Sequence, residues 1–172
     1  MSRAPIIITG FMASGKTTVA RALALALGCQ SIDLDQFIMD RTRRTPKEII
    51  EQDGESAFRE VETSFLREAL KKNLAAVIAL GGGAWTIELN RQLIAARGGF
   101  TVWLDAPFEL CWRRIAESGS ERPLAQRKAK ALDLYNQRRP IYGSTDLHLK
   151  AIAEASIDEI VEDIRRTILK EV

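Results

Sequence analysis

The sequence contains very little histidine and cysteine. Its 172 residues include one histidine, His148, and two cysteines, Cys29 and Cys111, with no Cys-x-x-Cys motif. A Ser-His-Asp or Cys-His triad would depend on His148 alone, and a zinc site would need His148 together with both isolated cysteines. These counts argue against both kinds of centre. His148 is interpreted as a residue of the core edge or surface, and the two separate cysteines favour a reducing, cytoplasmic environment.

Long apolar runs, an excess of one charge and a leader-like N-terminus are lacking as well. No apolar stretch approaches the roughly 20 residues needed to cross a bilayer, and the N-terminus does not resemble a signal or transit peptide. The 25 basic residues nearly balance the 23 acidic ones, which leaves a net charge of +2. This charge gives no general field for nucleic acid. We therefore expect neither a membrane partner nor a nucleic-acid partner.

The length and composition indicate one folded domain. A chain of 172 residues, 46% hydrophobic and 28% charged, can bury a single core without disulfides. Neither a low-complexity linker nor an internal repeat divides the sequence. We therefore treat residues 1–172 as one domain.

Apolar, β-branched runs alternate with helical patterns along the chain and predict an α/β fold. The runs cover residues 6–9, 76–80 and 100–104, and they are continuously apolar rather than alternating. Strands of this kind belong to a parallel sheet that is covered by helices on both faces. The pattern therefore predicts a three-layer α/β/α sandwich.

Capping residues locate several of the helices. Thr45-Pro46-Lys47-Glu48 combines an N-cap, proline at N1 and a capping-box glutamate, and Ser156 with Glu159 forms a second capping box. Further helices are predicted over residues 16–27, ended by Gly28, and over residues 55–72. Residues 117–130 interrupt the pattern with turn-forming and charged residues, so we predict a mobile loop there.

The strongest functional motif is Gly10-Phe11-Met12-Ala13-Ser14-Gly15-Lys16-Thr17, which matches G-x-x-x-x-G-K-[ST]. It lies directly between a predicted strand and a predicted helix, as the phosphate-binding loop requires. The glycines allow backbone N–H groups to converge on phosphates, and the helix N-terminus adds a positive dipole. Lys16 would reach the β- and γ-phosphate oxygens, and the Thr17 hydroxyl would bind Mg²⁺.

Three carboxylates are candidates for the same site. Asp33 and Asp35 follow an apolar run at positions i and i+2, so on an extended chain they would share one face about 6.5 Å apart. One could orient Mg²⁺ through water and the other an acceptor hydroxyl, although Asp35 could instead cap a helix over residues 36–43. Asp105 resembles a Walker B carboxylate, but the following Ala-Pro favours a helix N-cap. Asp33 is therefore the preferred carboxylate on the metal side.

Glycines and arginines provide candidate anion-binding groups. Gly81-Gly82-Gly83 follows a predicted strand and would either let backbone approach a ligand closely or form a flexible turn. Arg59 lies between Glu55 at i−4 and Glu62 at i+3, so a solvated ion-pair face is its default interpretation. Arg122 follows a flexible Ser-Gly-Ser and could close over transferring phosphate. Arg113, Arg114, Arg138 and Arg139 are each more typical of a surface.

Taken together and in this order, these features resemble the shikimate kinase family of P-loop small-molecule kinases over essentially the whole chain. The residues that carry the resemblance are 10–17, Asp33-Leu34-Asp35, Phe58-Arg59 with Glu62, Gly81-Gly82-Gly83-Ala84, Arg122-Pro123-Leu124 and Arg138-Arg139-Pro140-Ile141-Tyr142. The resemblance implies a five-stranded parallel sheet in the order 2-3-1-4-5 and a monomer. It also implies transfer of the γ-phosphoryl group of ATP to the 3-hydroxyl of shikimate, with Mg²⁺ as cofactor.

The resemblance also assigns roles to residues. Residues about 34–72 would form the shikimate-binding region, and residues about 117–130 the lid. Shikimate would be bound by Asp35, Arg59, Gly81, Gly82, Gly83 and Arg138, with the two arginines taking its carboxylate. ATP would be bound by Gly10, Ala13, Ser14, Gly15, Lys16, Thr17, Thr18, Arg114, which would stack on adenine, and the lid residue Arg122. Mg²⁺ would be held by Thr17 and Asp33, and catalysis would rest on Lys16, Asp35 and Arg122.

Three departures from the family pattern and two rival functions complete the prediction. Ala13 stands where the family usually has glycine, the spacing from Arg114 to Arg122 is slightly long, and residues 153–156 lack the proline of the family's adenine loop. The rivals are a related kinase such as gluconate kinase and a catalytically silent nucleotide-binding module. The glycine triplet with Arg59 and Arg138 speaks against the first, and the absence of N-K-x-D and D-x-x-G speaks against a guanine-nucleotide switch.

Overall fold

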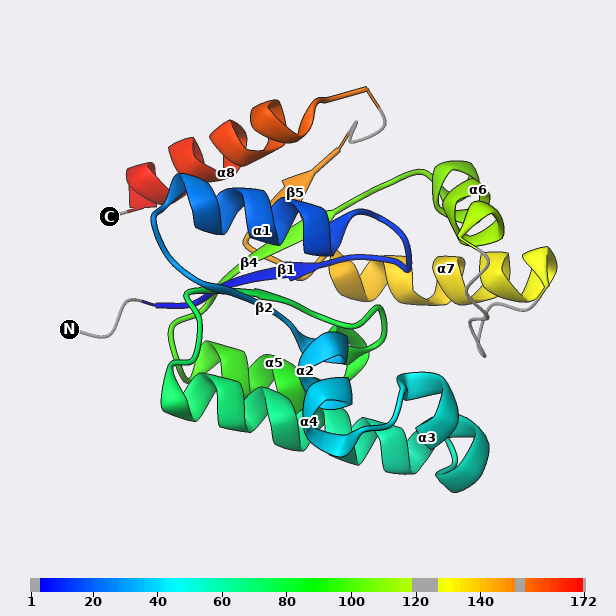
Figure 1. Cartoon of the computed structure of the whole chain (residues 1–172). Coiled ribbons are helices and arrows are strands. Elements are labelled where there is room, and N and C mark those ends of the chain that lie inside the picture. The colour runs from blue at the N-terminus through cyan, green and yellow to red at the C-terminus, as the bar shows by residue number, and fades with distance from the viewer. Residues whose placement is uncertain (1–3, 119–126, 151–153, 172) are drawn as a thin grey trace.

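A five-stranded parallel sheet forms the centre of the molecule (Figure 1). The computed structural model describes residues 4–118, 127–150 and 154–171. The sheet order is β2-β3-β1-β4-β5, and every pairing is parallel, which confirms the expected architecture. The strands are β1 (Ile6–Thr9), β2 (Ser31–Asp33), β3 (Val77–Ala79), β4 (Phe100–Leu104) and β5 (Leu147–Leu149).

Eight α-helices and one short 3₁₀ helix occur in the described parts of the chain. The 3₁₀ helix, η1 (Ala84–Thr86), directly follows the glycine triplet. The α-helices are α1 (Lys16–Ala26), α2 (Leu34–Thr42), α3 (Pro46–Asp53), α4 (Glu55–Lys72), α5 (Glu88–Ala95), α6 (Phe108–Glu117), α7 (Lys128–Tyr142) and α8 (Ile157–Glu171). None of the helices in these described residues is long and apolar enough to span a membrane.

Both faces of the sheet are covered, so the expected three layers are confirmed. Ile6 and Ile8 pack in one core cluster with residues of α1 and α8, whereas Ile7 packs in the other with residues of α4 and α5. Figure 1 shows α1 and α8 on one side of the sheet and α4 and α5 on the other. Neighbouring strand residues point to opposite faces. A strand with apolar layers on both sides therefore needs an unbroken apolar run such as Ile6-Ile7-Ile8.

Both predicted capping boxes are confirmed by their hydrogen bonds. Thr45 Oγ1 accepts from the Glu48 amide at 3.1 Å, while the Glu48 carboxylate accepts from the Thr45 amide at 2.6 Å. The same reciprocal arrangement joins Ser156 and Glu159. Each box satisfies N–H groups that a helix leaves without partners at its first turn.

Two expectations about element boundaries were wrong. The alternative of a helix over residues 36–43 capped by Asp35 was wrong: the helix begins at Leu34, and Asp33 is its N-cap, because the Asp33 carboxylate accepts from the Gln36 amide at 3.1 Å. The loop expected over residues 117–130 includes helical residues at both ends, since Glu117 closes α6 and residues 128–130 open α7. Residues 119–126 lie outside the described part of the chain.

Candidate active site

The phosphate-binding loop folds at the carboxyl end of β1, where two glycines adopt conformations that other residues avoid. Gly10 has φ 141°, and a Cβ there would lie 2.7 Å from the Leu104 carbonyl oxygen. Gly15 caps α1 with φ 99°. Both positions combine a positive φ with close packing or a helix start, so they require glycine. The loop therefore presents its backbone at the N-terminus of α1, as an anion-binding loop does.

Ala13 is the one non-glycine residue of this loop with a positive φ, at 58°. The left-handed conformation costs an L-residue about 1–2 kcal/mol because its Cβ crowds the carbonyl oxygen. The Ala13 carbonyl oxygen accepts a hydrogen bond from Arg114 Nη1 at 3.1 Å. The expected Gly-to-Ala departure is thus a strained position, and Arg114 of α6 contacts the loop directly.

A pocket of about 660 Å³ opens over this loop. One wall comes from α8 and the segment before it, with Ala155, Ile157 and Ile160. The buried Lys16 lies in the lining and donates from Nζ to the Phe11 carbonyl oxygen at 2.7 Å. Of the residues expected to bind ATP, those that line the pocket are Ala13, Ser14, Gly15, Lys16, Thr17, Thr18 and Arg114. Gly10 packs against the Leu104 carbonyl and is not part of the lining, and Arg122 lies outside the described residues.

Thr17 and Asp33 form a pair of oxygen donors in the same pocket. The Thr17 hydroxyl donates to Asp33 Oδ2, while Asp33 Oδ1 caps α2. Within the described residues, no cluster of three or more His, Cys, Asp or Glu side chains could hold a metal on its own. Mg²⁺ in phosphate-transfer sites takes few protein ligands and fills its other positions with water and phosphate oxygens. A hydroxyl beside a carboxylate fits that ion.

The glycine triplet is the point at which charged side chains from several elements converge. A Cβ on Gly81 would lie 2.6 Å from Glu62 Oε1 and 2.8 Å from Asp35 Oδ1. One on Gly82 would lie 3.7 Å from Arg138 Nη1, and one on Gly83 would lie 2.6 Å from the Arg59 guanidinium carbon. Side chains at these positions would displace the charged groups. The triplet therefore leaves a space lined by two cationic and two carboxyl groups, next to the phosphate loop.

Arg59 is held by two acids of its own helix, Glu55 and Glu62, but not on a solvated face as expected. Arg59 Nη1 lies 2.8 Å from Glu62 Oε2, and Nη2 lies 3.0 Å from Glu55 Oε1. The Arg59 side chain is only 18% exposed, and that of Glu62 is fully buried. Burial raises the pKa of Glu62 to about 7, although the neighbouring Arg59 opposes this shift. Arg59 is thus oriented by a buried ion pair.

Arg138 approaches the triplet from α7. Its side chain is buried, and burial lowers the pKa of its guanidinium, with the like charge of Arg59 acting in the same direction. The Tyr142 hydroxyl, one turn further on, donates to the Gly82 carbonyl oxygen at 2.5 Å. The structure thus brings together Asp35, Arg59, the glycines and Arg138, all of which the sequence had nominated.

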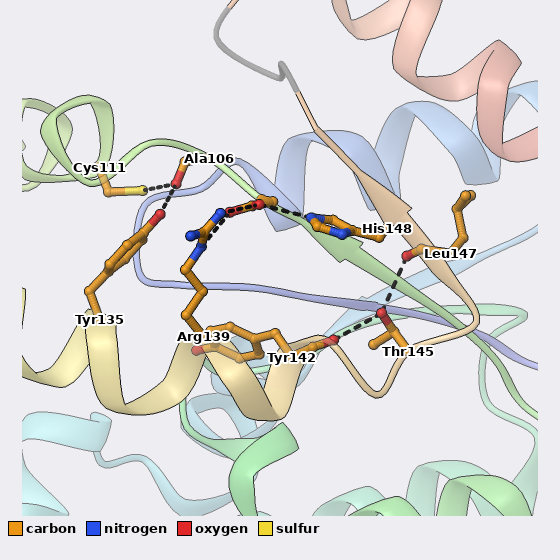
Figure 2. A network of polar contacts seen from close by, with 9 residues as sticks. Ala106, Cys111, Tyr135, Arg139, Tyr142, Thr145, Leu147 and His148 are labelled. Carbon is orange, nitrogen blue, oxygen red and sulfur yellow. Dashed lines mark hydrogen bonds and ion pairs between the residues drawn. The ribbon is translucent and has the colours of Figure 1, made fainter.

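Asp105 does not cap α6, and it is not among the residues that line the pocket over the phosphate loop. The N-cap of α6 is Pro107, without a side-chain cap bond. The Asp105 carboxylate instead accepts from Arg139 Nη2 and pairs with His148 Nε2, both at 2.8 Å. Figure 2 shows Arg139 and His148 extending toward one another on either side of this contact. The half-buried His148 lies on the edge strand β5, as expected for a residue of the core edge.

Sequence reasoning did not nominate three residues of this region. The sequence indicates Glu62 only as an ion-pair partner, Tyr142 only as part of a motif, and Met12 only as a loop position. A Cβ on Gly82 would lie 3.1 Å from Met12 Cγ, so this side chain packs against the triplet. The spacing of Glu62 three residues after Arg59 was the available signal, because residues at i and i+3 of a helix are neighbours.

The chain is similar to proteins of one family along nearly its full length. The family model described as shikimate kinase matches residues 12–169. The shikimate kinase of Ruegeria pomeroyi is 35% identical over 162 residues, which cover 92% of this chain and 82% of that protein. That of Nostoc punctiforme is 37% identical over 169 residues, covering 96% and 88%. A solved shikimate kinase from Acinetobacter baumannii in complex with shikimate has 34% identity and a TM-score of 0.89, covering 99% of this chain and 95% of that one.

Proposed function

The chain belongs to the shikimate kinase family, and on that premise we propose which of its residues carry the reaction. The enzyme transfers the γ-phosphoryl group of ATP to the 3-hydroxyl of shikimate, a step of the pathway to aromatic amino acids. The observation that carries the assignment is the convergence of Asp35, Arg59 and Arg138 on the glycine triplet beside the phosphate loop.

ATP binds in the pocket over the phosphate loop. The amides of residues 13–17 and the N-terminus of α1 receive the phosphates, with Lys16 supplying the cationic group. The adenine lies between the Arg114 guanidinium and the apolar wall of Ala155 and Ile157, a placement supported by their common position in the pocket lining. A planar guanidinium stacks well on an aromatic base. The missing proline in residues 153–156 is thus compensated by side chains of the α8 region.

The metal of this site is Mg²⁺, held by the Thr17 hydroxyl and Asp33, directly or through water. The family uses ATP and hence a divalent cation. A Mg²⁺ ion bound there would supply positive charge against the phosphate oxygens. The Thr17–Asp33 hydrogen bond supports the assignment, because it holds two hard oxygen donors in one place. Asp33 is fixed by its cap contact with α2 as well, so its orientation does not depend on the metal.

Shikimate binds against the glycine triplet with its carboxylate on Arg59 and Arg138. Two guanidinium groups in a buried site suit a carboxylate, because charge-assisted hydrogen bonds are the strongest available. Burial, together with the like charge of Arg59, lowers the pKa of Arg138, and a bound anion would offset both effects. Backbone at Gly82 and Gly83 can approach the ring closely, and Asp35 accepts a hydrogen bond from the ring hydroxyl.

The transfer itself is mainly positioning and charge stabilisation. Asp35 orients the 3-hydroxyl toward the γ-phosphorus and takes up its proton as the new O–P bond forms and the bond to the ADP oxygen breaks. Lys16 stabilises the negative charge on the transferring group. Arg122 is assigned the same stabilising role from the sequence, and it lies outside the described residues.

The proposal extends to the whole chain. Residues 1–172 form one domain, with about 34–72 as the shikimate-binding region and about 117–130 as the lid. A monomer is supported by the fact that residues of one chain line both the nucleotide pocket and the triplet. A cytoplasmic location is supported by Cys29 and Cys111, which are both free thiols. The substrates are small molecules, and we propose neither nucleic acid nor a membrane as a partner.

Release of ADP from Mg²⁺-ATP tests the assignment, with shikimate, gluconate and nucleoside monophosphates compared as acceptors. We expect turnover with shikimate alone, and a preference for gluconate would replace the acceptor assignment. Asp35→Asn should retain ATP binding and lose at least about a hundredfold in turnover, because an amide cannot take the proton. Asp40→Asn is the matched control, since Asp40 is exposed on the same helix and bonds Gln36. Near-normal turnover of Asp35→Asn would refute its role.

A further inference from the structure

The carboxylate of Asp105 is enclosed between the Arg139 guanidinium and the His148 imidazole at the end of β4. Its side chain is 6% exposed, and Oδ2 lies 2.8 Å from both Arg139 Nη2 and His148 Nε2. Burial alone would raise the pKa of Asp105, but hydrogen bonds from Arg139 and His148 hold it below its ordinary value. The Asp105 amide also donates to the Leu149 carbonyl oxygen at 3.0 Å. The carboxylate is therefore a fixed anionic point on the sheet, and no step of the reaction uses it.

Arg139, which contacts this point, is adjacent in α7 to Arg138 of the acceptor site. Successive helix residues point about 100° apart, so the two guanidinium groups leave the helix in different directions. Arg138 is buried toward Gly82, whereas Arg139 extends toward the end of β4 (Figure 2). The Trp103 ring lies beneath this contact, stacked on His148 with ring centroids 4.0 Å apart. The ion pair thus attaches α7 to the end of β4, next to the residue that binds the substrate carboxylate.

This part of α7 is weakly fixed by its own backbone. Pro140 lies inside the helix and cannot donate the hydrogen bond to the carbonyl four residues earlier. In the described residues, Arg138 has no carboxylate within ion-pair distance, and the like charge of Arg59 disfavours its position. Side-chain contacts must therefore hold the last turns. Beside the glycines, Tyr142 donates to the Gly82 carbonyl oxygen, and the Trp85 indole donates to the Ile141 carbonyl oxygen at 3.2 Å. On the other side, Arg139 attaches the helix to Asp105 at the end of β4.

We propose that Asp105 is a positioning residue for acceptor binding: through Arg139 it fixes the end of α7 and so sets the Arg138 guanidinium against the glycine triplet. This inference rests on the proposed role of Arg138. It assigns a function to a contact between α7 and the residue that follows β4, outside the nucleotide pocket. The fixed position matters because a carboxylate clamp of two arginines needs both groups at a defined separation.

Steady-state kinetics of two variants test the inference. Asp105→Asn and Arg139→Gln each should raise the KM for shikimate about tenfold, because each removes the ion pair between Asp105 and Arg139. The KM for ATP and kcat should stay within about twofold, since Lys16 and Asp35 belong to other elements. The double variant should be no worse than either single variant, because both act through one contact. Asp105→Glu keeps the charge and should recover most of the affinity.

Glu109→Gln is the matched control. Glu109 also pairs with α7, at Lys128 with an N–O distance of 2.7 Å, but at the opposite end of the helix from Arg138. This exposed pair should be dispensable, so the variant should keep the wild-type KM for shikimate. An equal rise in Glu109→Gln, or parallel rises of both KM values in Asp105→Asn, would indicate general loosening and overturn the inference.

Arg138→Met separates failure of the inference from failure of the assignment on which it rests. If Arg138→Met leaves the KM for shikimate unchanged, Arg138 does not bind the carboxylate, and both ideas fail. If Arg138→Met raises this KM while Asp105→Asn and Arg139→Gln leave it unchanged, only the positioning role fails. A rise in all three variants, with recovery in Asp105→Glu, supports the role of Asp105.

Discussion

The buried carboxyl group of Glu62 makes the stability of this protein depend on pH in an unusual direction. The side chain is fully buried, and only one of its oxygens, Oε2, has a hydrogen-bond partner among the described residues. Burial raises its pKa from 4.5 to about 7 against the opposing effect of Arg59, and the nearby charge of Asp35 raises it further. Most stabilising carboxylates have lowered pKa values in folded proteins, and they add stability as the pH rises. Glu62, with its raised pKa, should instead reduce stability as the pH rises.

The sign and size follow from proton linkage. Between about pH 4.5 and pH 7 the folded state holds the Glu62 proton and the unfolded state has lost it, so the folded state loses stability as the pH rises. A difference of about 2.5 pKa units at 1.36 kcal/mol per unit corresponds to about 3 kcal/mol. This contribution is fully present below pH 4.5 and is lost as the pH rises through about 7.

Urea unfolding of the wild type and of Glu62→Gln, at pH 5 and pH 8, measures this quantity. Glutamine resembles the protonated acid, so the two proteins should have similar free energies of unfolding at pH 5. At pH 8 the wild type should be less stable than the variant by about 3 kcal/mol, because its carboxylate is then ionised in a buried site. Comparing the two proteins at each pH cancels the titration of all other groups.

Glu60→Gln provides the control, since Glu60 is exposed on the same helix. The difference in free energy of unfolding between Glu60→Gln and the wild type should be the same at pH 5 and pH 8. The reasoning on Glu62 is refuted if the difference between wild type and Glu62→Gln changes by less than about 1 kcal/mol from pH 5 to pH 8, because the group would then titrate alike in the folded and unfolded states.

Two further predictions concern backbone positions. Gly83→Ala should raise the KM for shikimate at least about tenfold and leave the KM for ATP unchanged in steady-state assays, because the new Cβ would lie 2.6 Å from the Arg59 guanidinium carbon and displace it; an unchanged KM for shikimate would contradict this. Ala13→Gly should raise the free energy of unfolding by about 1 kcal/mol, since it relieves a left-handed alanine with φ 58°. A less stable variant in urea titrations would show that the loop does not store this strain.

Much of the fold and part of the site could be predicted because their signals are local. The phosphate loop is a contiguous motif, the capping boxes at Thr45 and Ser156 span four residues each, and the unbroken apolar run of β1 reflects burial on both faces. Resemblance supplied the sheet order, which no local pattern contains. The choice between Asp33 and Asp35 as the helix cap was not predictable, because both residues have the required side chain and only the end of β2 decides between them.

The sequence by itself determined the nucleotide half of this protein: where the loop lies, which lysine and threonine it presents, and which helix begins there. The residue patterns alone did not place Arg59 and Arg138 together, which only the family resemblance implied. The tertiary structure decided that both lie at the glycine triplet, that Glu62 is buried beside it, and that Asp105 binds Arg139 instead of capping α6. The reason is physical. Backbone conformation and capping depend on neighbours in the chain, whereas burial and ion pairing depend on which surfaces the packed sheet and helices bring together.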